Sequence, residues 1–136
     1  KAAGRLTYAY ANATVPKVTV VTGQAYGTAY LTMCSKALGA DIVYAWDKAS
    51  IGMMDPSAAV KIMYAKEIET AEDAPALIAE KAAAYGKEQS SAQAAARRGY
   101  VDDIIAPADT RKRVAAALEM LFTKREDRPD KKHGTV

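Results

Sequence analysis

The 136-residue sequence has few of the side chains that usually bind metals or act as nucleophiles, since it contains one Cys, one His and one Trp. A single cysteine cannot close an internal disulfide, which favours a reducing compartment, the cytoplasm. One Cys and one His cannot supply a zinc site of the usual ligand types. The only histidine, His133, lies in a charged C-terminal tail, so a Ser-His-Asp triad is not expected.

Long apolar runs and a strong charge imbalance are missing as well. No run approaches the roughly 18–20 residues of a membrane-spanning helix, so no membrane span is expected. The net charge of +3 is small and the basic residues are interleaved with acidic ones, so no nucleic-acid partner is expected. Residues 1–13 have the pattern of the middle of an amphipathic helix, without Met, helix cap or signal peptide. We therefore expect a fragment, or a mature chain cut from a longer precursor.

Alanine is the abundant residue type, at 30 of 136 positions. Hydrophobic residues make up 50% of the chain and charged residues 26%, which is the composition of a globular domain rather than a disordered chain. A chain of this length can bury roughly 65–70% of its unfolded surface. Because alanine has the best helix propensity and little volume, we expect closely packed helices.

The hydrophobic pattern predicts helices and strands that alternate along the chain. Apolar spacing with Gly and Pro boundaries predicts helices over residues 1–13, 28–37, 56–64, 70–84, 90–98 and 107–122. Short β-branched or apolar runs predict strands over 18–22, 41–46 and 101–105, with a fourth candidate at 49–54. The last helix is expected to bury a stripe of Val114, Leu118, Leu121 and Phe122. This order predicts an α/β fold with a short sheet flanked by helices.

The most informative segment is Val20–Tyr30, where a strand leads through a turn bounded by Gly23 and Gly27 into a helix. The free N–H groups at the start of a helix carry a partial positive charge and bind phosphate or a developing oxyanion. Glycine at such a turn lets a ligand approach the backbone closely. An equally simple interpretation is that both glycines only serve the turn.

A nucleotide site is a second interpretation of the same segment. Thr22-Gly23-x-x-x-Gly27 resembles the glycine motif of short-chain dehydrogenases, and Tyr44-x-x-x-Lys48 resembles their Tyr/Lys pair. In those enzymes the pair lies far downstream of the motif, whereas here Tyr44 follows within about twenty residues and falls in a predicted strand. The chain is also too short for a full dehydrogenase, so this interpretation is disfavoured.

A third interpretation comes from a resemblance that covers nearly the whole chain. Matching segments occur in the same order at Tyr8–Lys17, Ala25–Tyr30, Ser35–Asp41, Tyr44–Trp46, Arg98–Ile105, Ala117–Leu121 and Lys131–Gly134. In these segments the chain resembles the C-terminal part of the carboxyltransferase subunit of biotin-dependent acyl-CoA carboxylases and decarboxylases, of the propionyl-CoA carboxylase β type. So many ordered matches are more specific than any single motif.

The resemblance implies an incomplete crotonase-like (ClpP-like) fold. Residues 1–122 would form the later part of the subunit's second half, and residues 123–136 a charged C-terminal arm. It also implies an enzyme that moves a carboxyl group between carboxybiotin, on a carrier protein, and an acyl-CoA. The implied partners are the N-terminal carboxyltransferase half or subunit, the biotin carboxyl carrier protein, and further copies of the chain in a homo-oligomer.

The resemblance also assigns roles to the residues of the turn. The backbone N–H groups of Thr28 and Ala29, with Gly27 as the turn, would hold the biotin ureido oxygen as CO2 departs. Tyr26, Tyr30 and Leu31 would contact substrate, with Leu31 lining the acyl pocket. The chain departs from the family pattern at Thr28, where Gly is usual, and a β-branched residue there narrows backbone freedom. Such a site needs no catalytic side chain, because aligned amides stabilise the developing charge.

Two other functions remain open from the sequence. The chain could be a non-catalytic crotonase-like oligomerisation module, or a fragment of an acyl-CoA hydratase or hydrolase, for which Asp55 is the only candidate carboxylate.

Other notable side chains are expected to have structural rather than catalytic roles. Cys34 is expected to be a buried thiol, and Trp46 and the pair Met53-Met54 to be core residues. Arg97-Arg98 is expected on a solvated face, with CoA phosphate contact as the minor alternative.

Overall fold

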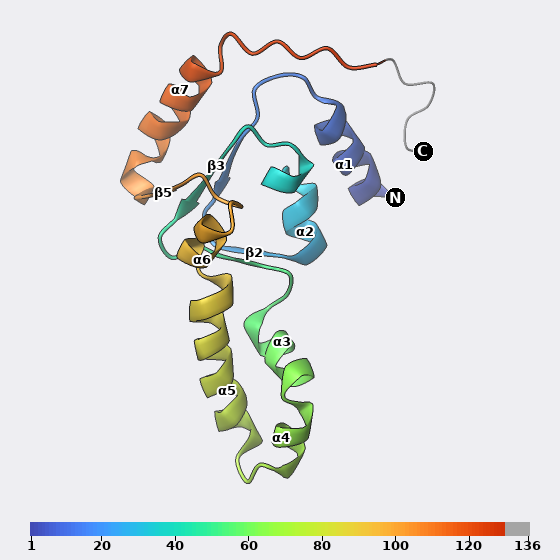
Figure 1. The fold of residues 1–136 in the computed structure, drawn as a ribbon, viewed down its shortest axis with the longest axis vertical. Helices are drawn as coiled ribbons and strands as arrows, with labels where there is room; N and C mark the ends of the chain where they lie inside the picture. Colours follow the sequence, from blue (N-terminus) through green and yellow to red (C-terminus); the bar gives the residue numbers. More distant parts are fainter. Residues whose placement is uncertain (130–136) are drawn as a thin grey trace.

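The computed structural model describes residues 1–129, which contain two short parallel sheets surrounded by helices (Figure 1). In one sheet the strands β1 (Val18–Val21), β3 (Ile42–Trp46) and β5 (Asp103–Ile105) lie in the order β1-β3-β5. The other sheet pairs β2 (Gln24–Tyr26) with β4 (Ser50–Gly52). All of these pairings are parallel, so each connection between paired strands is a crossover. The expected α/β architecture is therefore confirmed.

Helices make up most of the remainder of the described chain. They are α1 (Ala2–Asn12), α2 (Gly27–Thr32), α3 (Pro56–Met63), α4 (Ala65–Thr70), α5 (Ala74–Tyr85), α6 (Ala92–Arg97) and α7 (Thr110–Met120). Short helical turns of other types cover Lys36–Leu38, Gly86–Ser90 and Pro107–Asp109. None of the helices within residues 1–129 has both the length and the apolar character required to cross a bilayer.

The core is built around β3, the central strand. Val43 and Ala45 point into a cluster that includes Ala92 and Ala95 of α6, whereas Tyr44 packs with Ala117 of α7 on the opposite face. Successive strand residues point to opposite faces of a sheet, so a strand covered on both sides needs apolar residues throughout. The buried alanines of α6 and α7 let these helices lie close to the strands, as the alanine content predicted.

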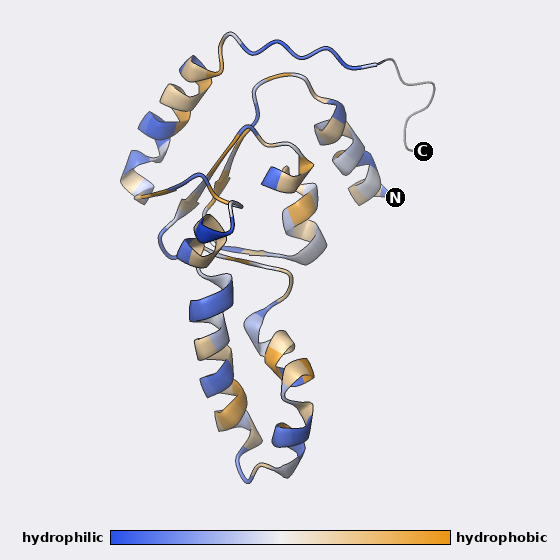
Figure 2. Cartoon of the chain, viewed as in Figure 1, coloured by the Kyte–Doolittle hydropathy of each residue, from blue (hydrophilic) through white to orange (hydrophobic). Residues whose placement is uncertain are grey.

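A helical hairpin formed by α3, α4 and α5 extends away from the sheets (Figure 1). Its first helix begins as the sequence predicted, because the Asp55 carboxylate accepts hydrogen bonds from the amides of Ser57 and Ala58 and Pro56 occupies the first helical position. Figure 2 shows apolar residues along α3, and Ile62 and Met63 there are exposed.

Several expected boundaries are wrong. Residues 23–27 do not form a simple turn, since Gln24–Tyr26 is strand β2. The helix expected over 28–37 ends at Thr32, because Cys34 adopts a left-handed conformation with φ of 62°. The helix expected over 70–84 begins at Ala74, where Asp73 caps it. The stripe predicted on α7 is only partly buried, as the side chain of Phe122 is 79% exposed and Leu118 is exposed too.

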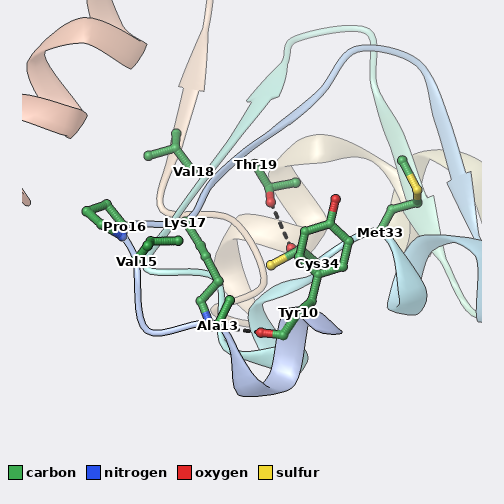
Figure 3. Close-up of a pocket in the computed structure, with 9 residues that line it drawn as sticks. All are labelled: Tyr10, Ala13, Val15, Pro16, Lys17, Val18, Thr19, Met33 and Cys34. Atoms are coloured by element: carbon green, nitrogen blue, oxygen red, sulfur yellow. Dashed lines mark hydrogen bonds between the residues drawn. The ribbon is translucent and has the colours of Figure 1, made fainter. Parts of the chain in front are cut away.

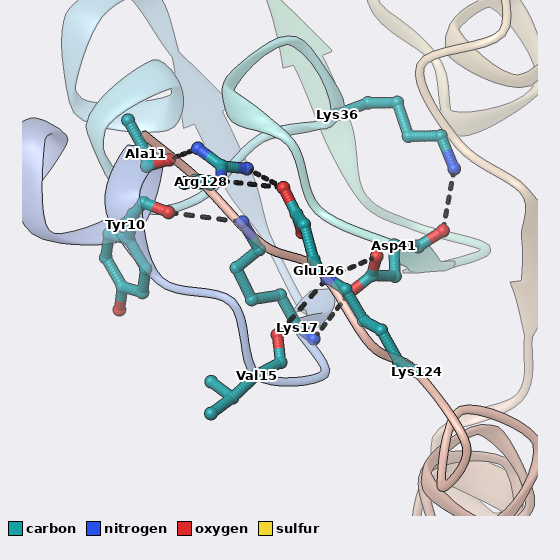
Figure 4. A network of polar contacts seen from close by, with 9 residues as sticks. All are labelled: Tyr10, Ala11, Val15, Lys17, Lys36, Asp41, Lys124, Glu126 and Arg128. Carbon is teal, nitrogen blue, oxygen red and sulfur yellow. Dashed lines mark hydrogen bonds and ion pairs between the residues drawn. The ribbon is translucent and has the colours of Figure 1, made fainter. Parts of the chain in front are cut away.

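Beyond α7 the chain continues without helix or strand over residues 124–129 and returns to the N-terminal helix. An ionic network fixes this segment (Figure 4). Lys124 Nζ lies 2.9 Å from both carboxylate oxygens of Asp41 and 3.2 Å from Glu126. Arg128 pairs with Glu126 and donates to the carbonyl oxygen of Ala11. The segment Lys131–Gly134, with His133, lies outside the described residues.

Candidate functional site

The turn between β2 and α2 depends on one glycine rather than two. Gly27 has a φ of +59°, and a Cβ atom built on it would lie 3.1 Å from the carbonyl oxygen of Met53. Side chains other than glycine rarely adopt such a conformation, and here the neighbouring atom is backbone that cannot easily move. Gly23 shows no comparable demand, since no atom lies within 4 Å of its position for a Cβ. The backbone therefore requires glycine at position 27 but not at position 23.

Strand pairing positions this turn. Tyr26 pairs with Gly52 across the β2–β4 ladder, and its hydroxyl donates to Ser50 Oγ at 2.7 Å. Ser50 Oγ donates in turn to the carbonyl oxygen of Ser90 at 3.2 Å, which ties the turn to the end of the hairpin. The Tyr26 hydroxyl is therefore already hydrogen-bonded within the fold. Helix α2 begins at the next residue, Gly27.

The first turn of α2 presents free backbone donors. Thr28 and Ala29 are both exposed, and Tyr26, the residue that precedes the helix, makes no side-chain hydrogen bond to its amides. The first N–H groups of a helix have no partner within the helix. The first turn of α2 is compatible with the predicted role of the Thr28 and Ala29 amides, which stays a prediction.

A cavity of about 420 Å³ adjoins this turn. Its lining includes Gly27, Leu31 and Met53, together with Gln89, from the end of the hairpin, and Tyr100. The Leu31 side chain is 38% exposed, which fits its expected place beside a substrate. Met53 was expected in the core, but it is 77% exposed and lies at the cavity wall; its neighbour Met54 is exposed too, so the core prediction is wrong for both.

Two residues that line this cavity have buried hydroxyl groups without a hydrogen-bond partner within residues 1–129. These groups are Tyr30 Oη, on α2, and Ser35 Oγ, whose side chain is almost fully buried. Burial, together with the nearby Tyr100, raises the pKa of the Tyr30 phenol above its ordinary value of 10.0. The Tyr30 hydroxyl therefore stays protonated and available as a donor at neutral pH.

Other predicted residues lie elsewhere. Asp55 caps α3 and does not line the cavity, and the Tyr44 hydroxyl, 3.5 Å from the carbonyl oxygen of Arg113, lies on the α7 side of β3, away from Gly27. Trp46 is half-buried, and its Nε1 donates to Thr110 Oγ1 at 2.9 Å. Tyr44, Lys48 and Asp55 are thus all absent from the described residues that line the cavity.

Cys34 is buried, as predicted, beside a separate cavity of about 370 Å³ (Figure 3). Thr19 Oγ1 donates to the Cys34 carbonyl oxygen at 2.8 Å, and Lys17 Nζ donates to the Tyr10 carbonyl oxygen at 3.2 Å. These contacts join α1 and β1 to the end of α2. This second cavity does not include Gly27 or Leu31.

Sequence reasoning missed the residues that complete the cavity. Ser35 appeared only within a segment of the family resemblance, and nothing in the local pattern places Tyr85, Gln89 or Ser90 in one cavity with Leu31. Tyr85, Gln89 and Ser90 reach the cavity through the hairpin, whose return to the sheet is a tertiary feature. Arg98 was expected on a solvated face and is exposed, with its guanidinium donating to Gln89.

Comparisons with known proteins agree on one family. A family model described as the carboxyl transferase domain matches residues 1–136. The methylmalonyl-CoA carboxyltransferase 12S subunit of Propionibacterium freudenreichii subsp. shermanii is 52% identical over 130 residues, which cover 96% of this chain and 25% of that protein. The propionyl-CoA carboxylase carboxyltransferase subunit of Haloferax mediterranei is 51% identical over 132 residues, covering 97% and 26%. The chain thus spans about a quarter of the length of these relatives.

Solved structures resemble the fold closely. The transcarboxylase 12S structure, described as a hexamer assembly with methylmalonyl-coenzyme A bound, superposes with a TM-score of 0.90 at 50% identity, covering 98% of this chain and 26% of that one. The geranyl-CoA carboxylase β subunit of P. aeruginosa gives a TM-score of 0.74 at 26% identity, with the same coverage of both chains. These matches confirm the crotonase-like fold that the sequence predicted.

Proposed function

Because the chain belongs to the carboxyl transferase domain family, we propose that it is the biotin-side portion of an acyl-CoA carboxyltransferase. The observation that carries this proposal is the turn itself, in which the exposed residues Thr28 and Ala29 directly follow the left-handed Gly27, and Gly27 lines the cavity. Relatives that are about half identical to this chain are named as methylmalonyl-CoA and propionyl-CoA carboxyltransferase subunits. Whether the carboxyl group moves towards or away from the acyl-CoA is left open by the proposal.

The amides fit the demand of this reaction. Biotin, when bound, supplies a ureido nitrogen from which one carboxyl group passes to the α-carbon of an acyl thioester, while one proton passes in the opposite direction. The Thr28 and Ala29 N–H groups would donate to the ureido oxygen, where negative charge develops during transfer. Donors fixed in a helix turn need no reorganisation as charge develops, which is why losing one such donor costs about 3–4 kcal/mol in comparable sites. No side chain is then required as nucleophile.

The remaining site residues have supporting roles in the proposal. Tyr26 holds the turn through its hydrogen bond to Ser50 and, as the residue before Gly27, would contact substrate. Leu31 lines the cavity and would contact the acyl group. Thr28 adds a β-branched side chain at a position where the family usually has glycine, which would crowd the approach to its own amide.

The proposal includes partners and a location. The carboxyl group would arrive on a biotin carboxyl carrier protein, and the acyl-CoA would be held mainly by an N-terminal carboxyltransferase half or subunit. Homo-oligomerisation is supported by the hexamer assembly described for the 12S relative. We place the enzyme in the cytoplasm, in keeping with its free cysteine. Residues 1–122 would form the catalytic portion and residues 123–136 an arm.

The test is a pair of substitutions at one position in the complete subunit that contains this segment. Thr28→Pro removes the N–H at a place in a first turn that proline tolerates, whereas Thr28→Gly keeps it. We expect Thr28→Pro to lower kcat for carboxyl transfer from carboxybiotin about 10²–10³-fold, and Thr28→Gly to change it far less. The difference between the variants isolates the amide from the side chain.

Circular dichroism and oligomeric state should be the same for both Thr28 variants. Equal activity of the two would contradict a role for the Thr28 amide. Absence of transfer by the unmodified subunit, with carboxylated carrier protein and a range of short acyl-CoA thioesters, would instead favour the non-catalytic oligomerisation module that the sequence left open.

A further inference from the structure

Helix α1 has little apolar packing to hold it in place. It lies beside α2 (Figure 1), but within residues 1–129 none of its side chains is fully buried, and Tyr10 is the residue through which it joins the central core cluster. The stability of helices in proteins comes mostly from the packing of an apolar face. Polar contacts should therefore matter more for the position of α1 than for a helix with buried residues such as α6.

Two cations bind the carbonyl end of α1 (Figure 4). Lys17 Nζ donates to the Tyr10 carbonyl oxygen at 3.2 Å, and the Arg128 guanidinium donates to the carbonyl oxygen of Ala11. The last four carbonyl groups of a helix have no partner within it and carry a partial negative charge, so cations are favourable there. Lys17 is close to α1 in sequence, whereas Arg128 comes from the segment that follows α7.

Three charged side chains of that segment connect α1 to the sheet, and we call Lys124, Glu126 and Arg128 the clasp. Lys124 Nζ lies 2.9 Å from the carboxylate of Asp41, next to β3, and donates to the carbonyl oxygen of Val15 at 3.3 Å. Glu126 pairs with both Lys124 and Arg128. A continuous series of ion pairs thus leads from the start of β3 to the end of α1.

The end of α1 also forms part of the wall of the separate cavity of about 370 Å³ (Figure 3). Tyr10 and Ala13 line this cavity together with Met33 and Cys34. Cys34 is only 4% exposed, and Tyr10 packs against the core cluster to which Cys34 belongs. Movement of α1 away from the sheet should therefore uncover Cys34.

We propose that the clasp holds α1 in place beside this cavity, and that opening of the clasp releases α1 and exposes Cys34 while the sheets stay folded. The core cluster around Val43 and Ala45 is formed mostly by residues outside α1, so release of α1 should need less free energy than global unfolding. Because its ion pairs are partly exposed, salt should weaken the clasp. The cavity does not include Gly27, so this inference is independent of the proposed function.

The experiment uses the 136-residue chain, in which Cys34 is the only cysteine and Trp46 the only tryptophan. Alkylation of Cys34 by iodoacetamide, an uncharged reagent, reports the release of α1. Trp46 fluorescence reports the sheet, because this residue ends β3 and its Nε1 donates to Thr110. We expect Arg128→Ala to raise the alkylation rate about three- to tenfold at low salt.

The dependence on urea separates local release from global unfolding. Below the urea concentration at which Trp46 fluorescence changes, the alkylation rate of the unmodified chain should vary little with urea, because release of one helix exposes little surface. If Cys34 reacted only in the unfolded chain, the rate would instead rise steeply with urea over the same range.

Arg125→Ala is the matched control, because Arg125 is an exposed arginine of the same segment that, within residues 1–129, donates only to the nearby carbonyl oxygens of Phe122 and Lys124. It should be alkylated at the rate of the unmodified chain. Glu126→Gln keeps the size of the side chain, removes its charge from the clasp, and should accelerate alkylation as Arg128→Ala does. Raising the KCl concentration from about 0.05 M to about 0.5 M should accelerate the unmodified chain more than either clasp variant.

Two results would overturn the inference. One is an equal alkylation rate for Arg125→Ala and for both clasp variants, Glu126→Gln and Arg128→Ala, which would show that the clasp does not hold α1. The other is an alkylation rate of the unmodified chain that rises steeply with urea, which would show that Cys34 is exposed only by global unfolding. Use of two clasp variants keeps the first comparison decisive if circular dichroism shows that one of them does not fold.

Discussion

At the scale of single residues, substitution of the two glycines of the motif, Gly23 and Gly27, should affect stability very differently. Gly27→Ala must place a side chain at a φ of +59°, with its Cβ 3.1 Å from the Met53 carbonyl oxygen. We expect the free energy of unfolding to fall by at least about 1–2 kcal/mol, measured by urea titration. Gly23→Ala has open space and no left-handed backbone, so it should stay within about 0.5 kcal/mol of the unmodified chain.

Similar losses for the two glycine variants would contradict this assignment. A smaller loss for Gly27→Ala than for Gly23→Ala would mean that the turn relies on the first glycine of the motif. Carboxyl transfer should also fall in Gly27→Ala, because a shift of the turn moves the Thr28 amide, and remain in Gly23→Ala.

The same residues show what a sequence can predict about this site. The pattern Gly27-Thr28-Ala29 identified the exposed amides, because a helix start leaves N–H groups free whatever lies around it. It could not identify Ser35 as a cavity residue, since Ser35 shares the cavity with Tyr85 and Gln89, which are distant in sequence. The pattern also could not distinguish Gly23 from Gly27. A side chain at position 27 is excluded by the Met53 carbonyl oxygen, which is distant in sequence.

At the scale of elements, local signals predicted several helix starts and strand β4, but missed β2, the other strand of the short second sheet. Ser91 caps α6 through the Ala94 amide at 3.2 Å, and Asp55 caps α3, close to the starts of two helices that the sequence predicted. Strand β2 was missed because its three residues are a strand only through pairing with Ser50–Gly52. Pairing between segments this far apart in sequence leaves no local pattern of hydrophobic residues. A helix cap, in contrast, can be recognised from two or three adjacent residues.

The cap at Asp55 gives a test of the hydratase alternative. Asn caps helices about as well as Asp, while Ala does not. We therefore expect Asp55→Asn to keep both stability and carboxyl transfer, and Asp55→Ala to lower the free energy of unfolding by about 1 kcal/mol. Urea titration and the transfer assay would be run on both variants. If the Asp55 carboxylate acted as an acid or base, Asp55→Asn would still keep its stability but would lose activity.

At the scale of the whole molecule, the ionic network around Asp41 joins segments from both ends of the chain (Figure 4). The Asp41 side chain is 20% exposed and accepts from the Lys17 amide at 2.7 Å as well as from Lys124. This carboxylate therefore connects the start of β1 with the segment that follows α7. Because its partners lie 24 and 83 residues away in sequence, the network could not be predicted from the charge pattern of the tail alone.

The network predicts a defined pH dependence of stability. Burial would raise the pKa of Asp41, but the hydrogen bonds from Lys124 and Lys17 outweigh it and hold the pKa below the ordinary value of 3.8. A carboxyl with a lowered folded-state pKa stabilises fully above its unfolded pKa and loses that contribution as pH falls through the folded value. Asp41→Asn should thus lower the free energy of unfolding by about 1–2 kcal/mol at pH 7, and the difference from the unmodified chain should shrink below about pH 4.

Asp127→Asn is the matched control for Asp41→Asn, because Asp127 is an exposed acid of the same segment and forms no ion pair within residues 1–129. Urea titrations of the three proteins between pH 7 and pH 3 measure both effects. Asp127→Asn should match the unmodified chain at every pH. A stability difference for Asp41→Asn that stays constant down to pH 3 would show that packing of the side chain, rather than its charge, connects the two ends of the chain, since only the charged form of Asp41 is lost over that range.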